Sequence, residues 1–477
     1  MSAEKNFYLT TTLPYVNADP HIGFALEIVH ADIVARHRRL MGRDVFFTTG
    51  TDEHGQKIFQ KAESEGRDVQ AYVDHFASSF SRLKEGLNLS YDAFIRTTDP
   101  KHVAAAQELW KRCAAKGDIY KKKYKGLYCV GDEAFLKESD LVDGKCPNHP
   151  NMVPIEIEEE NYFFRLSAYQ DKLLSYLSNE EVITPAWRRE EAINFVKQGL
   201  EDFSISREAA RMSWGVPVPG DETQVMYVWF DALTNYISTL GWPNEEGNFK
   251  KFWQQGEVMQ VAGKDQVRFQ SVMWQAMLMS AEIKNTDKVV YHGFVTSGGQ
   301  KMSKSLGNVI DPFMLVEEYG TDVVRYFLAR HVHPFEDSDV TLERFKELYN
   351  GNLANGLGNL VSRIMQLAQT NLEEPVSVEF VGYPKEFTDS LERFEINEAC
   401  DYIFRRIQAL DQEITRTEPF KVVKTDKEKG KELITNLVKE LAAVDLLLEP
   451  IMPETSKKII DAIVANKKPE NLFTRKD

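Results

Sequence analysis

The chain is short of cysteine, of long apolar runs and of net positive charge, and each shortage excludes a class of protein. Only four cysteines occur in 477 residues, which is too few for a disulfide scaffold of this size and fits a reducing compartment. No apolar run approaches the roughly 18 residues that a membrane-spanning helix needs, and the first residues lack a secretory pattern. We therefore expect a cytoplasmic protein with no membrane partner.

The net charge and the length of the chain say less about the class of protein than these shortages do. A net charge of −15 argues on average against a nucleic-acid partner. Local basic runs such as 121–123 and 188–189 could still meet phosphates, although each run taken singly is better explained as a solvated surface. At roughly 150 residues per domain, the length predicts about three domains.

A predicted strand, a sharp turn and a predicted helix open the chain. The apolar run Phe7–Leu9 predicts the strand, and the helical pattern that begins near His21 ends near Gly42. At such a junction, the free N–H groups of the first helical turn and the positive end of the helix dipole converge, which suits a phosphate. Taken alone, however, the stretch is better explained as a proline-initiated helix with an aspartate cap and an incidental histidine.

The first quarter of the chain, from Phe7 to about Lys116, alternates short apolar strands with amphipathic helices, which is typical of a parallel, doubly wound sheet. Such sheets bind ligands beyond the carboxyl ends of their strands, where the strand order reverses. The loops after Leu9 and after Phe47 are therefore the candidate positions. The pattern also predicts a strand over 227–229, a polar linker over 421–430, and helices nearly throughout the chain from about residue 311.

Two motifs far apart in the chain together resemble the signatures of class I aminoacyl-tRNA synthetases. The first is His21-Ile22-Gly23, and the second is Lys301-Met302-Ser303-Lys304-Ser305. Four further stretches narrow the resemblance to the methionyl-tRNA synthetases, and these are residues 12–15, 51–55, 227–233 and 448–453. The resemblance runs from about Phe7 to the last predicted helix. The chain departs from the first motif at Phe24, where the family usually has a second histidine that contacts phosphate.

The resemblance implies an α/β fold with a doubly wound, parallel-sheet, Rossmann-like catalytic domain, an inserted connective domain and a C-terminal α-helical bundle. The implied regions are the first half of the catalytic domain (1–116), the insertion (117–207), the second half (208–298), the Lys-Met-Ser-Lys-Ser loop with a stem-contact region (299–345), and the anticodon-binding helices (346–477). The implied reaction activates methionine with ATP and Mg²⁺ to methionyl-adenylate, then transfers methionine to the 3′ end of tRNA(Met). We expect a monomer.

The resemblance also assigns roles to particular residues. Catalytic roles fall on His21, Lys301 and Lys304, which with magnesium would neutralise the charge on the phosphates of ATP. The ATP-binding positions are Gly23, Glu27, Gly263, Asp265, Val295, Lys301 and Lys304. The methionine-binding positions are Leu13, Tyr15, Asp52, Trp229, Ala232, Tyr236 and Gln270. Judged without the resemblance, such an aromatic stripe is more often core, and a lone aspartate such as Asp52 is equally plausible as a helix cap.

Two glutamines change the expected methionine pocket. Gln266 and Gln270 stand where the family usually has isoleucine and histidine, near the methionine sulfur. An amide can donate a hydrogen bond and a thioether is a weak acceptor, so one expectation is that Gln270 takes over the role of the histidine while Tyr236 helps from the opposite side. The alternative is that both amides turn away from the pocket.

The helical part of the chain carries the implied anticodon-binding residues. Asn359 and Arg363 are four residues apart, hence on one helix face, and they match the family's base-reading pair. Phe420 stands where the family usually has tryptophan, and it could still stack on a base. Without the first half of the chain, all three would be taken as ordinary surface and core of a helical bundle.

The predicted insertion carries a degenerate zinc pattern. The two ligand pairs are Cys129-x-x-Asp132 and Cys146-x-x-His149, and Asp132 stands where zinc-binding members of the family have cysteine. Zinc accepts carboxylate oxygen as well as thiolate and imidazole, but the loss of one thiolate weakens a structural site. We favour a metal-free segment with two buried, reduced cysteines over a zinc site.

Two other functions remain open at this point. Another class I adenylate-forming enzyme would share both signatures but would not need Trp229, Tyr236 or a helical tail. A catalytically altered tRNA-binding relative would tolerate Phe24, but it would have little reason to keep both Lys301 and Lys304. Exchange of pyrophosphate into ATP, measured with each amino acid in turn, separates these possibilities.

Overall fold

The computed structural model describes residues 6–130, 134–136, 138–147, 151–302, 307–379 and 382–477. The chain forms two compact units. The first comprises Met1–Pro20, Arg38–Lys84 and Ser90–His292, and the second comprises His21–His37, Glu85–Leu89 and Gly293–Asp477. No helix within the described residues is both long enough and apolar enough to cross a membrane.

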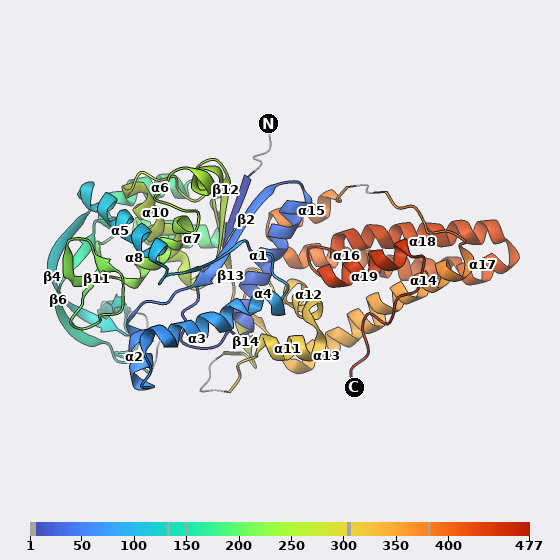
Figure 1. Cartoon of the computed structure of the whole chain (residues 1–477), viewed down its shortest axis with the longest axis horizontal. Coiled ribbons are helices and arrows are strands. Elements are labelled where there is room, and N and C mark those ends of the chain that lie inside the picture. The colour runs from blue at the N-terminus through green and yellow to red at the C-terminus, as the bar shows by residue number, and fades with distance from the viewer. Residues whose placement is uncertain (1–5, 131–133, 137, 148–150, 303–306, 380–381) are drawn as a thin grey trace. The chain divides into compact units, whose positions relative to one another are not determined.

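A parallel sheet of six strands forms the centre of the first unit, in the order β3-β2-β1-β12-β13-β7 (Figure 1). The strands are β1 (Asn6–Thr10), β2 (Asp44–Thr51), β3 (Ala93–Arg96), β7 (Ile183–Thr184), β12 (Glu257–Gly263) and β13 (Lys288–His292). In β1, Tyr8 pairs with Phe46 on one side and with Val258 on the other. The chain first builds β1, β2 and β3 in one direction and later adds β12 on the other side of β1. The strand order therefore reverses between β1 and β12, and the predicted doubly wound α/β fold is confirmed.

The helices of the first unit include α2 (Gln56–Ser64), α3 (Val69–Ser81), α5 (Pro100–Ala115), α6 (Gln170–Leu177), α7 (Ala186–Lys197), α8 (Val228–Leu233), α9 (Asn235–Ser238), the π-helices η3 (Phe249–Gln254) and η5 (Phe269–Met273), and α10 (Trp274–Ser280). Of these, α3 packs on β2, α7 on β7, and η3 on β1 and β12. Two helices, α1 (Ile22–Leu40) and α4 (Leu83–Gly86), include residues of both units. Asp68 caps α3 and Asp99 caps α5, each through its side chain.

The strand predicted over 227–229 is wrong, because the chain turns into α8 at Val228. The preceding strand, β11 (Asp221–Met226), ends one residue before the extended Tyr227. Val228, Phe230 and Leu233 are buried and Trp229 is half-buried, so this short helix has no face that is exposed to solvent. A helix without an exposed face lacks the periodicity that distinguishes it from a buried strand.

The predicted insertion contains an antiparallel sheet, in the order β5-β4-β6-β8. Its strands are β4 (Ile119–Cys129), β5 (Ala134–Leu136), β6 (Ile155–Phe164) and β8 (Phe203–Ser204). Beside it, β9 (Ser206–Glu208), β10 (Pro217–Val218) and β11 form a smaller sheet. The edge strand β7 of the central sheet also comes from residues 117–207. The predicted domain boundaries stay predictions, because the two units divide the chain differently.

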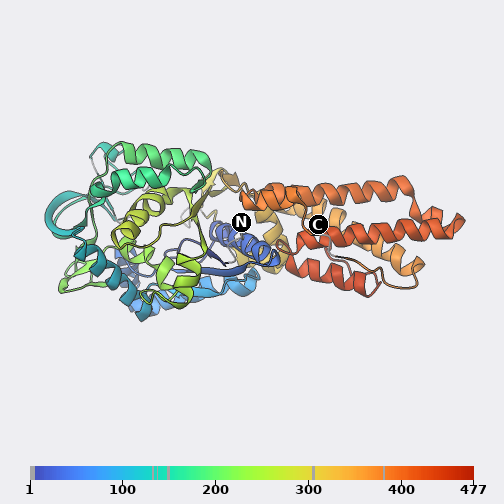
Figure 2. The same ribbon diagram turned by 90° about the horizontal axis from the view of Figure 1, so that it is seen from above.

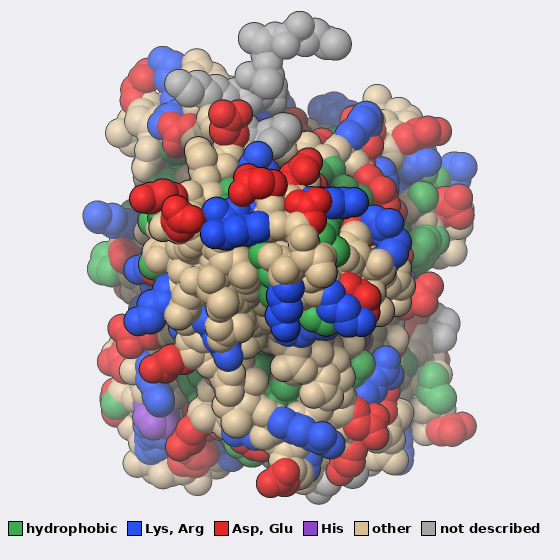
Figure 3. Space-filling model, turned by 90° about the vertical axis from the view of Figure 1, so that its right-hand side faces the viewer, with side chains coloured by type: hydrophobic (Ala, Val, Ile, Leu, Met, Phe, Trp, Pro, Cys, Tyr) green, Lys and Arg blue, Asp and Glu red, His purple; other side chains and the backbone are tan. Residues whose placement is uncertain are grey.

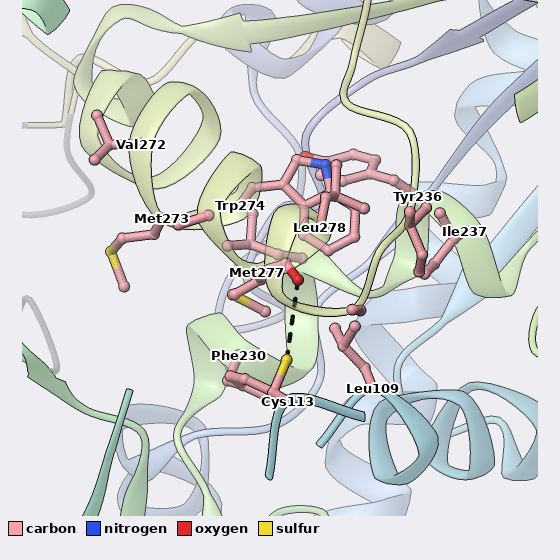
Figure 4. Packing of buried hydrophobic residues seen from close by; sticks show 14 of the residues in the cluster. Leu109, Cys113, Phe230, Tyr236, Ile237, Val272, Met273, Trp274, Met277 and Leu278 are labelled. Carbon is pink, nitrogen blue, oxygen red and sulfur yellow. Dashed lines mark hydrogen bonds between the residues drawn. The ribbon is translucent and has the colours of Figure 1, made fainter. Parts of the chain in front are cut away.

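The core of the first unit lies between α5, α8, α9 and α10 (Figure 4). Leu109 and Cys113 of α5 lie against Phe230 and Met277, and the Cys113 Sγ lies 3.9 Å from the Met277 carbonyl oxygen. Burial raises the pKa of the Cys113 thiol to about 12. This cysteine is therefore a packing residue and not a nucleophile.

The second unit combines a three-stranded sheet with helices. The strands are β14 (Val295–Ser297), β15 (Gln300–Lys301) and β16 (Ser338–Asp339). The helices are α11 (Pro312–Tyr319), α12 (Thr321–His331), α13 (Leu342–Leu348), the π-helix η7 (Tyr349–Gly358), α14 (Asn359–Asn371), α15 (Lys385–Glu392), α16 (Ile396–Thr417), α17 (Pro419–Thr425), α18 (Lys427–Leu448) and α19 (Pro453–Val464). Helices α14, α16 and α18 lie side by side (Figures 1 and 2), as predicted for a C-terminal bundle.

The polar linker predicted over 421–430 is also wrong. These residues complete α17 and begin α18, with only Asp426 between the two helices, where its side chain caps α18. A Cβ at Gly430 would lie 2.3 Å from the Val423 Cα. Gly430, at the end of the predicted linker, is therefore needed because α17 and α18 pack closely at this position.

A buried arginine, Arg325 of α12, joins distant parts of the second unit. Its side chain has no exposed surface and lies 2.8 Å from the Asp32 carboxylate of α1. The guanidinium also donates to the carbonyl oxygens of Leu87, Pro450 and Ile451, at 2.9–3.0 Å. Bonds to one carboxylate and three carbonyls offset much of the cost of burying the charge.

Candidate active site

Three loops of the first unit meet where the strand order reverses, at the carboxyl ends of β1, β2 and β12. Leu13 and Tyr15 follow β1, and Asp52 follows β2. The first two loops are tied together, because the Asp52 amide donates to the Pro14 carbonyl at 3.0 Å and Tyr15 and Asp52 form a β-bridge. Gly263 ends β12, and Asp265 lies exposed in the following 3₁₀ turn. This is the position at which doubly wound sheets bind their ligands.

The loop that carries Asp52 is held rigid by its neighbours. Asp52 itself is 4% exposed. The next residue, Glu53, is fully buried and accepts two hydrogen bonds from Arg96, at 2.6 and 2.8 Å. Its backbone is held as well, since its amide donates to Thr97 and its carbonyl accepts from the Trp214 indole. A carboxylate in such a fixed and nearly dry position is suited to a cationic ligand.

An aromatic and apolar surface forms the predicted methionine side-chain site. Trp229 of α8 stacks on Phe269, with ring centroids 3.8 Å apart and planes inclined by 15°. Ala232 is buried nearby along α8, and Tyr236 is buried in α9 (Figure 4). Phe269 was not among the residues predicted from the sequence.

The two unusual glutamines have different surroundings. The buried Gln270 lies in η5, and its amide nitrogen donates to the Tyr236 hydroxyl. Gln275 donates in turn to the Gln270 carbonyl at 3.0 Å. Gln266 is half-buried, and its amide nitrogen donates to Asp265 at 3.1 Å. Of the two amides, only that of Gln270 is joined to the predicted methionine pocket.

The first signature motif belongs to the second unit. The Gly23 amide donates to His21 Nδ1 at 3.0 Å, so the neutral ring carries its proton on Nε2 and can donate from there. The ring of Phe24 lies 4.5 Å from that of His21. A Cβ at Gly23 would lie 2.8 Å from the His21 ring, so the glycine is needed for this ring position. Glu27 follows in the same helix and is 8% exposed.

The second signature motif is only partly described. Lys301 ends β15, where it pairs with Thr296 of β14, and the side chain of Met302 is buried. Val295, at the start of β14, is also buried. Residues 303–306, including the predicted catalytic Lys304, lie outside the described residues.

The predicted anticodon residues lie in helices of the second unit. Asn359 and Arg363 lie in the first turns of α14, and Arg363 forms an exposed ion pair with Asp411 of α16. Phe420 of α17 is 41% exposed, so it is not part of the bundle core. On the face shown in Figure 3, lysine and arginine side chains are interspersed with aspartate and glutamate.

The predicted zinc ligands are described only in part. Cys129 and Cys146 are each 1% exposed, whereas Asp132 and His149 lie outside the described residues. Within the described ranges, no group of three or more His, Cys, Asp or Glu side chains is arranged to hold a metal ion. Two cysteines do not complete a four-ligand zinc site, and both the zinc pattern and the preference for a metal-free segment stay predictions.

Comparison with known proteins identifies relatives over nearly the whole chain. The family described as "tRNA synthetases class I (M)" matches residues 7–152 and 150–365. A methionine–tRNA ligase of Mesorhizobium japonicum is 42% identical over 487 residues, which cover 98% of this chain and 93% of that protein. One from Fusobacterium nucleatum is 38% identical over 486 residues, which cover 98% and 76%.

Solved structures of methionyl-tRNA synthetases are also similar to this chain. A Mycobacterium tuberculosis methionyl-tRNA synthetase in complex with methionyl-adenylate superposes with a TM-score of 0.89 at 38% identity, covering 96% of this chain and 93% of that one. The apo form of the synthetase from the same organism gives a TM-score of 0.83 at 34% identity, covering 99% and 98%.

Proposed function

The chain belongs to the methionyl-tRNA synthetases of class I, and from this premise we propose how its residues carry out the ATP-dependent ligation of methionine to tRNA. In the first step, the methionine carboxylate attacks the α-phosphate of ATP and pyrophosphate leaves. In the second, the methionyl group passes from the adenylate to the terminal adenosine of tRNA(Met). Neither step needs a covalent protein nucleophile, so the protein supplies position and charge.

The observation that carries this proposal is the meeting of the loops after β1, β2 and β12 at the reversal point of the sheet. Asp52 would bind the ammonium of methionine, because it is a nearly buried carboxylate in a fixed loop. Gly263 and Asp265 would face the adenosine, with Asp265 accepting from the ribose hydroxyls. The amino acid and the nucleotide would then lie at adjacent strand ends.

The thioether of methionine would lie against Trp229 and Ala232 and be recognised by Tyr236. Because Gln270 donates to the Tyr236 oxygen, the hydrogen of that hydroxyl can be directed to another acceptor, and sulfur is a weak one. This changes the expectation drawn from the sequence, in which Gln270 itself donated to sulfur. In the revised proposal, Gln270 orients Tyr236.

The phosphates of ATP would be bound by His21, Lys301 and Lys304. The Gly23 amide fixes His21 as a donor from Nε2, and Phe24 supports the ring by contact. Phe24 cannot supply the hydrogen bond of the family's second histidine, so this protein would rely more on His21 and the two lysines. Mg²⁺ would arrive with ATP and add positive charge at the phosphates.

The remaining proposals concern tRNA binding, cellular location and oligomeric state. Asn359, Arg363 and Phe420 would read the anticodon of tRNA(Met), and the exposed Phe420 ring is available for stacking. The cytoplasmic location and the monomeric state also remain proposals.

The proposed function is tested by ATP–pyrophosphate exchange with each of the natural amino acids, followed by charging of tRNA(Met). We expect exchange with methionine and charging of its tRNA. Exchange with a different amino acid would identify another class I synthetase. Binding of tRNA without any exchange would identify a catalytically altered relative.

A further inference from the structure

A buried aspartate, Asp231, accepts hydrogen bonds from two histidines and joins three elements of the first unit. Asp231 lies in α8 and has no exposed surface. Its Oδ2 lies 2.7 Å from Nδ1 of His54, in the loop after β2. Its Oδ1 lies 2.8 Å from Nε2 of His102, in α5. None of the three is among the residues to which the family resemblance assigned a role.

Asp231 is ionised in this arrangement. Burial alone would raise the pKa of its carboxyl group, but His54 and His102 outweigh burial and hold the pKa at about 2. Each ring therefore donates an N–H to a carboxylate oxygen, which makes both bonds charge-assisted. The second ring nitrogen of His102 lies 2.9 Å from the Ser238 hydroxyl, which can donate to it. Such bonds are stronger than hydrogen bonds between neutral groups, and these lie in a nearly dry environment.

The His54–Asp231 bond connects the two sides of the proposed methionine site. His54 comes two residues after Asp52, the proposed ammonium ligand. Asp231 lies between Trp229 and Ala232, which form part of the proposed thioether surface. Because α8 is a helix of only six residues, a displacement of Asp231 carries Trp229 and Ala232 with it.

Other bonds hold the neighbouring segment, so the loss of this bond should loosen the site without unfolding it. The Tyr8 hydroxyl donates to the Tyr236 carbonyl at 2.8 Å, and Thr48 and Thr239 are joined through their hydroxyls at 3.2 Å. These bonds attach α9 and the residue after it to β1 and β2. The His54–Asp231 bond adds a connection from α8 to the loop that carries Asp52.

We propose that His54 and Asp231 are positioning residues that fix the distance between the ammonium-binding and thioether-binding ends of the methionine site. This inference rests on the proposed function. The separation of the ammonium and the sulfur is set by the length of the substrate side chain, so a fixed distance in the protein selects for that length. A small misplacement of either end reduces the productive binding of methionine.

The test compares His54→Phe with His54→Asn in ATP–pyrophosphate exchange. Phenylalanine keeps a flat ring but removes the donor, whereas the amide nitrogen of asparagine can occupy the position of Nδ1. We expect His54→Phe to raise the KM for methionine about tenfold, the scale for losing one hydrogen bond to a charged group, with the KM for ATP changed less than about twofold. His54→Asn should stay within about threefold of the wild type.

A second measurement reads the distance directly. S-methylcysteine has one methylene fewer than methionine between the ammonium and the sulfur, and a missing methylene normally costs about 10–200-fold in kcat/KM. In His54→Phe this discrimination should fall at least about threefold, because the two ends of the site are no longer held apart by a fixed distance.

His102→Phe is the matched control. It removes the bond to the other oxygen of Asp231, but it leaves in place the His54–Asp231 bond that joins α8 to the loop of Asp52. It should lower the melting temperature about as much as His54→Phe and leave both the ratio of the two KM values and the S-methylcysteine discrimination unchanged.

Three results would overturn the inference. The first is an equal change in the KM values for methionine and ATP in His54→Phe. The second is a discrimination against S-methylcysteine that is unchanged in His54→Phe. The third is a His54→Asn variant that has the melting temperature of the wild type but does not restore the KM for methionine. A wild-type protein that shows no methionine-dependent exchange would instead refute the proposed function, which keeps the two failures distinct.

Discussion

The two units of the molecule contain buried aspartates with opposite properties. Asp231 of the first unit accepts from two histidines, and its pKa is about 2. Asp445 of α18 in the second unit is also buried, but burial, and to a lesser degree the charge of Glu449, raises the pKa of its carboxyl group to about 8. Within the described residues, Asp445 Oδ1 has no hydrogen-bond partner.

The difference shows that the partners of a buried carboxyl group, more than its depth, decide whether it is charged. A charged Asp231 can hold other groups in place and lies within the proposed methionine site. A neutral Asp445 holds nothing by charge and lies among bundle helices. We therefore expect charged groups near the sheet to control the chemistry, and polar groups of the helical bundle to control tRNA binding or stability.

The largest expected effect comes from Asp52→Asn in the first unit. Removing one partner of a buried, hydrogen-bonded charge pair costs about 2–5 kcal/mol, so kcat/KM for methionine in ATP–pyrophosphate exchange should fall by roughly 10²–10³-fold. The KM for ATP and the binding of tRNA should stay close to wild type. A fall of less than threefold would show that Asp52 does not bind the ammonium of methionine, and that the charged groups of the first unit do not control the chemistry.

Phe420→Ala tests the second unit. Loss of one base stack should cost about 1–3 kcal/mol in tRNA binding, measured by filter binding or by the KM for tRNA in charging. Exchange of pyrophosphate in the absence of tRNA should be unaffected, because the side chain is exposed. An equal loss of tRNA binding and of pyrophosphate exchange would contradict the assignment of tRNA binding to the second unit alone.

Gln270→Leu sharpens the description of the methionine site. Norleucine nearly matches methionine in shape but cannot accept a hydrogen bond at the sulfur position. Without the amide that orients Tyr236, kcat/KM should fall more for methionine than for norleucine, by a difference of about 1 kcal/mol. If the two substrates fall together, recognition depends on the shape formed by Trp229 and Tyr236.

The smallest expected effect is on stability and comes from Asp445→Asn. The pKa of Asp445 is raised in the folded protein, so the folded state holds a proton that the unfolded state releases above its ordinary pKa of about 4. This group therefore lowers stability progressively as the pH rises from about 4 to about 8. Asp445→Asn should raise the melting temperature by a few degrees at pH 8 and hardly at all at pH 4. An equal change at both values would show that folding does not raise the pKa of this carboxyl group.

The sequence predicted the fold class correctly, and it indicated which loops come together, because both depend on local signals. Alternating apolar strands and helices indicated the doubly wound sheet, and the sheet itself determines which loops meet at the reversal point. This was enough to bring Tyr15 and Asp52 together. The errors occurred where local signals mislead, as at the helix over 228–233, which has no exposed face, and over 421–430, where polar residues belong to two helices and Gly430 permits their close packing.

The contacts between distant residues could not be predicted in this way. His54 and Asp231 are separated by 177 positions, and no periodicity or spacing marks two residues so far apart as partners. Both lie in stretches that resembled the family, 51–55 and 227–233, but the resemblance assigned chemistry to their neighbours and not to them. The same holds for Arg96, whose bonds to Glu53 depend on the parallel pairing of β2 and β3.

Arg325 has a consequence for protein engineering. Its guanidinium holds Asp32 of α1, the helix that starts next to His21, together with the carbonyl oxygens of Pro450 and Ile451, which lie between α18 and α19. No neutral side chain can satisfy a carboxylate and several carbonyls at once. In a chimera that takes its helical bundle from another synthetase, Arg325, Asp32 and the 450–451 turn should therefore be kept together as one set.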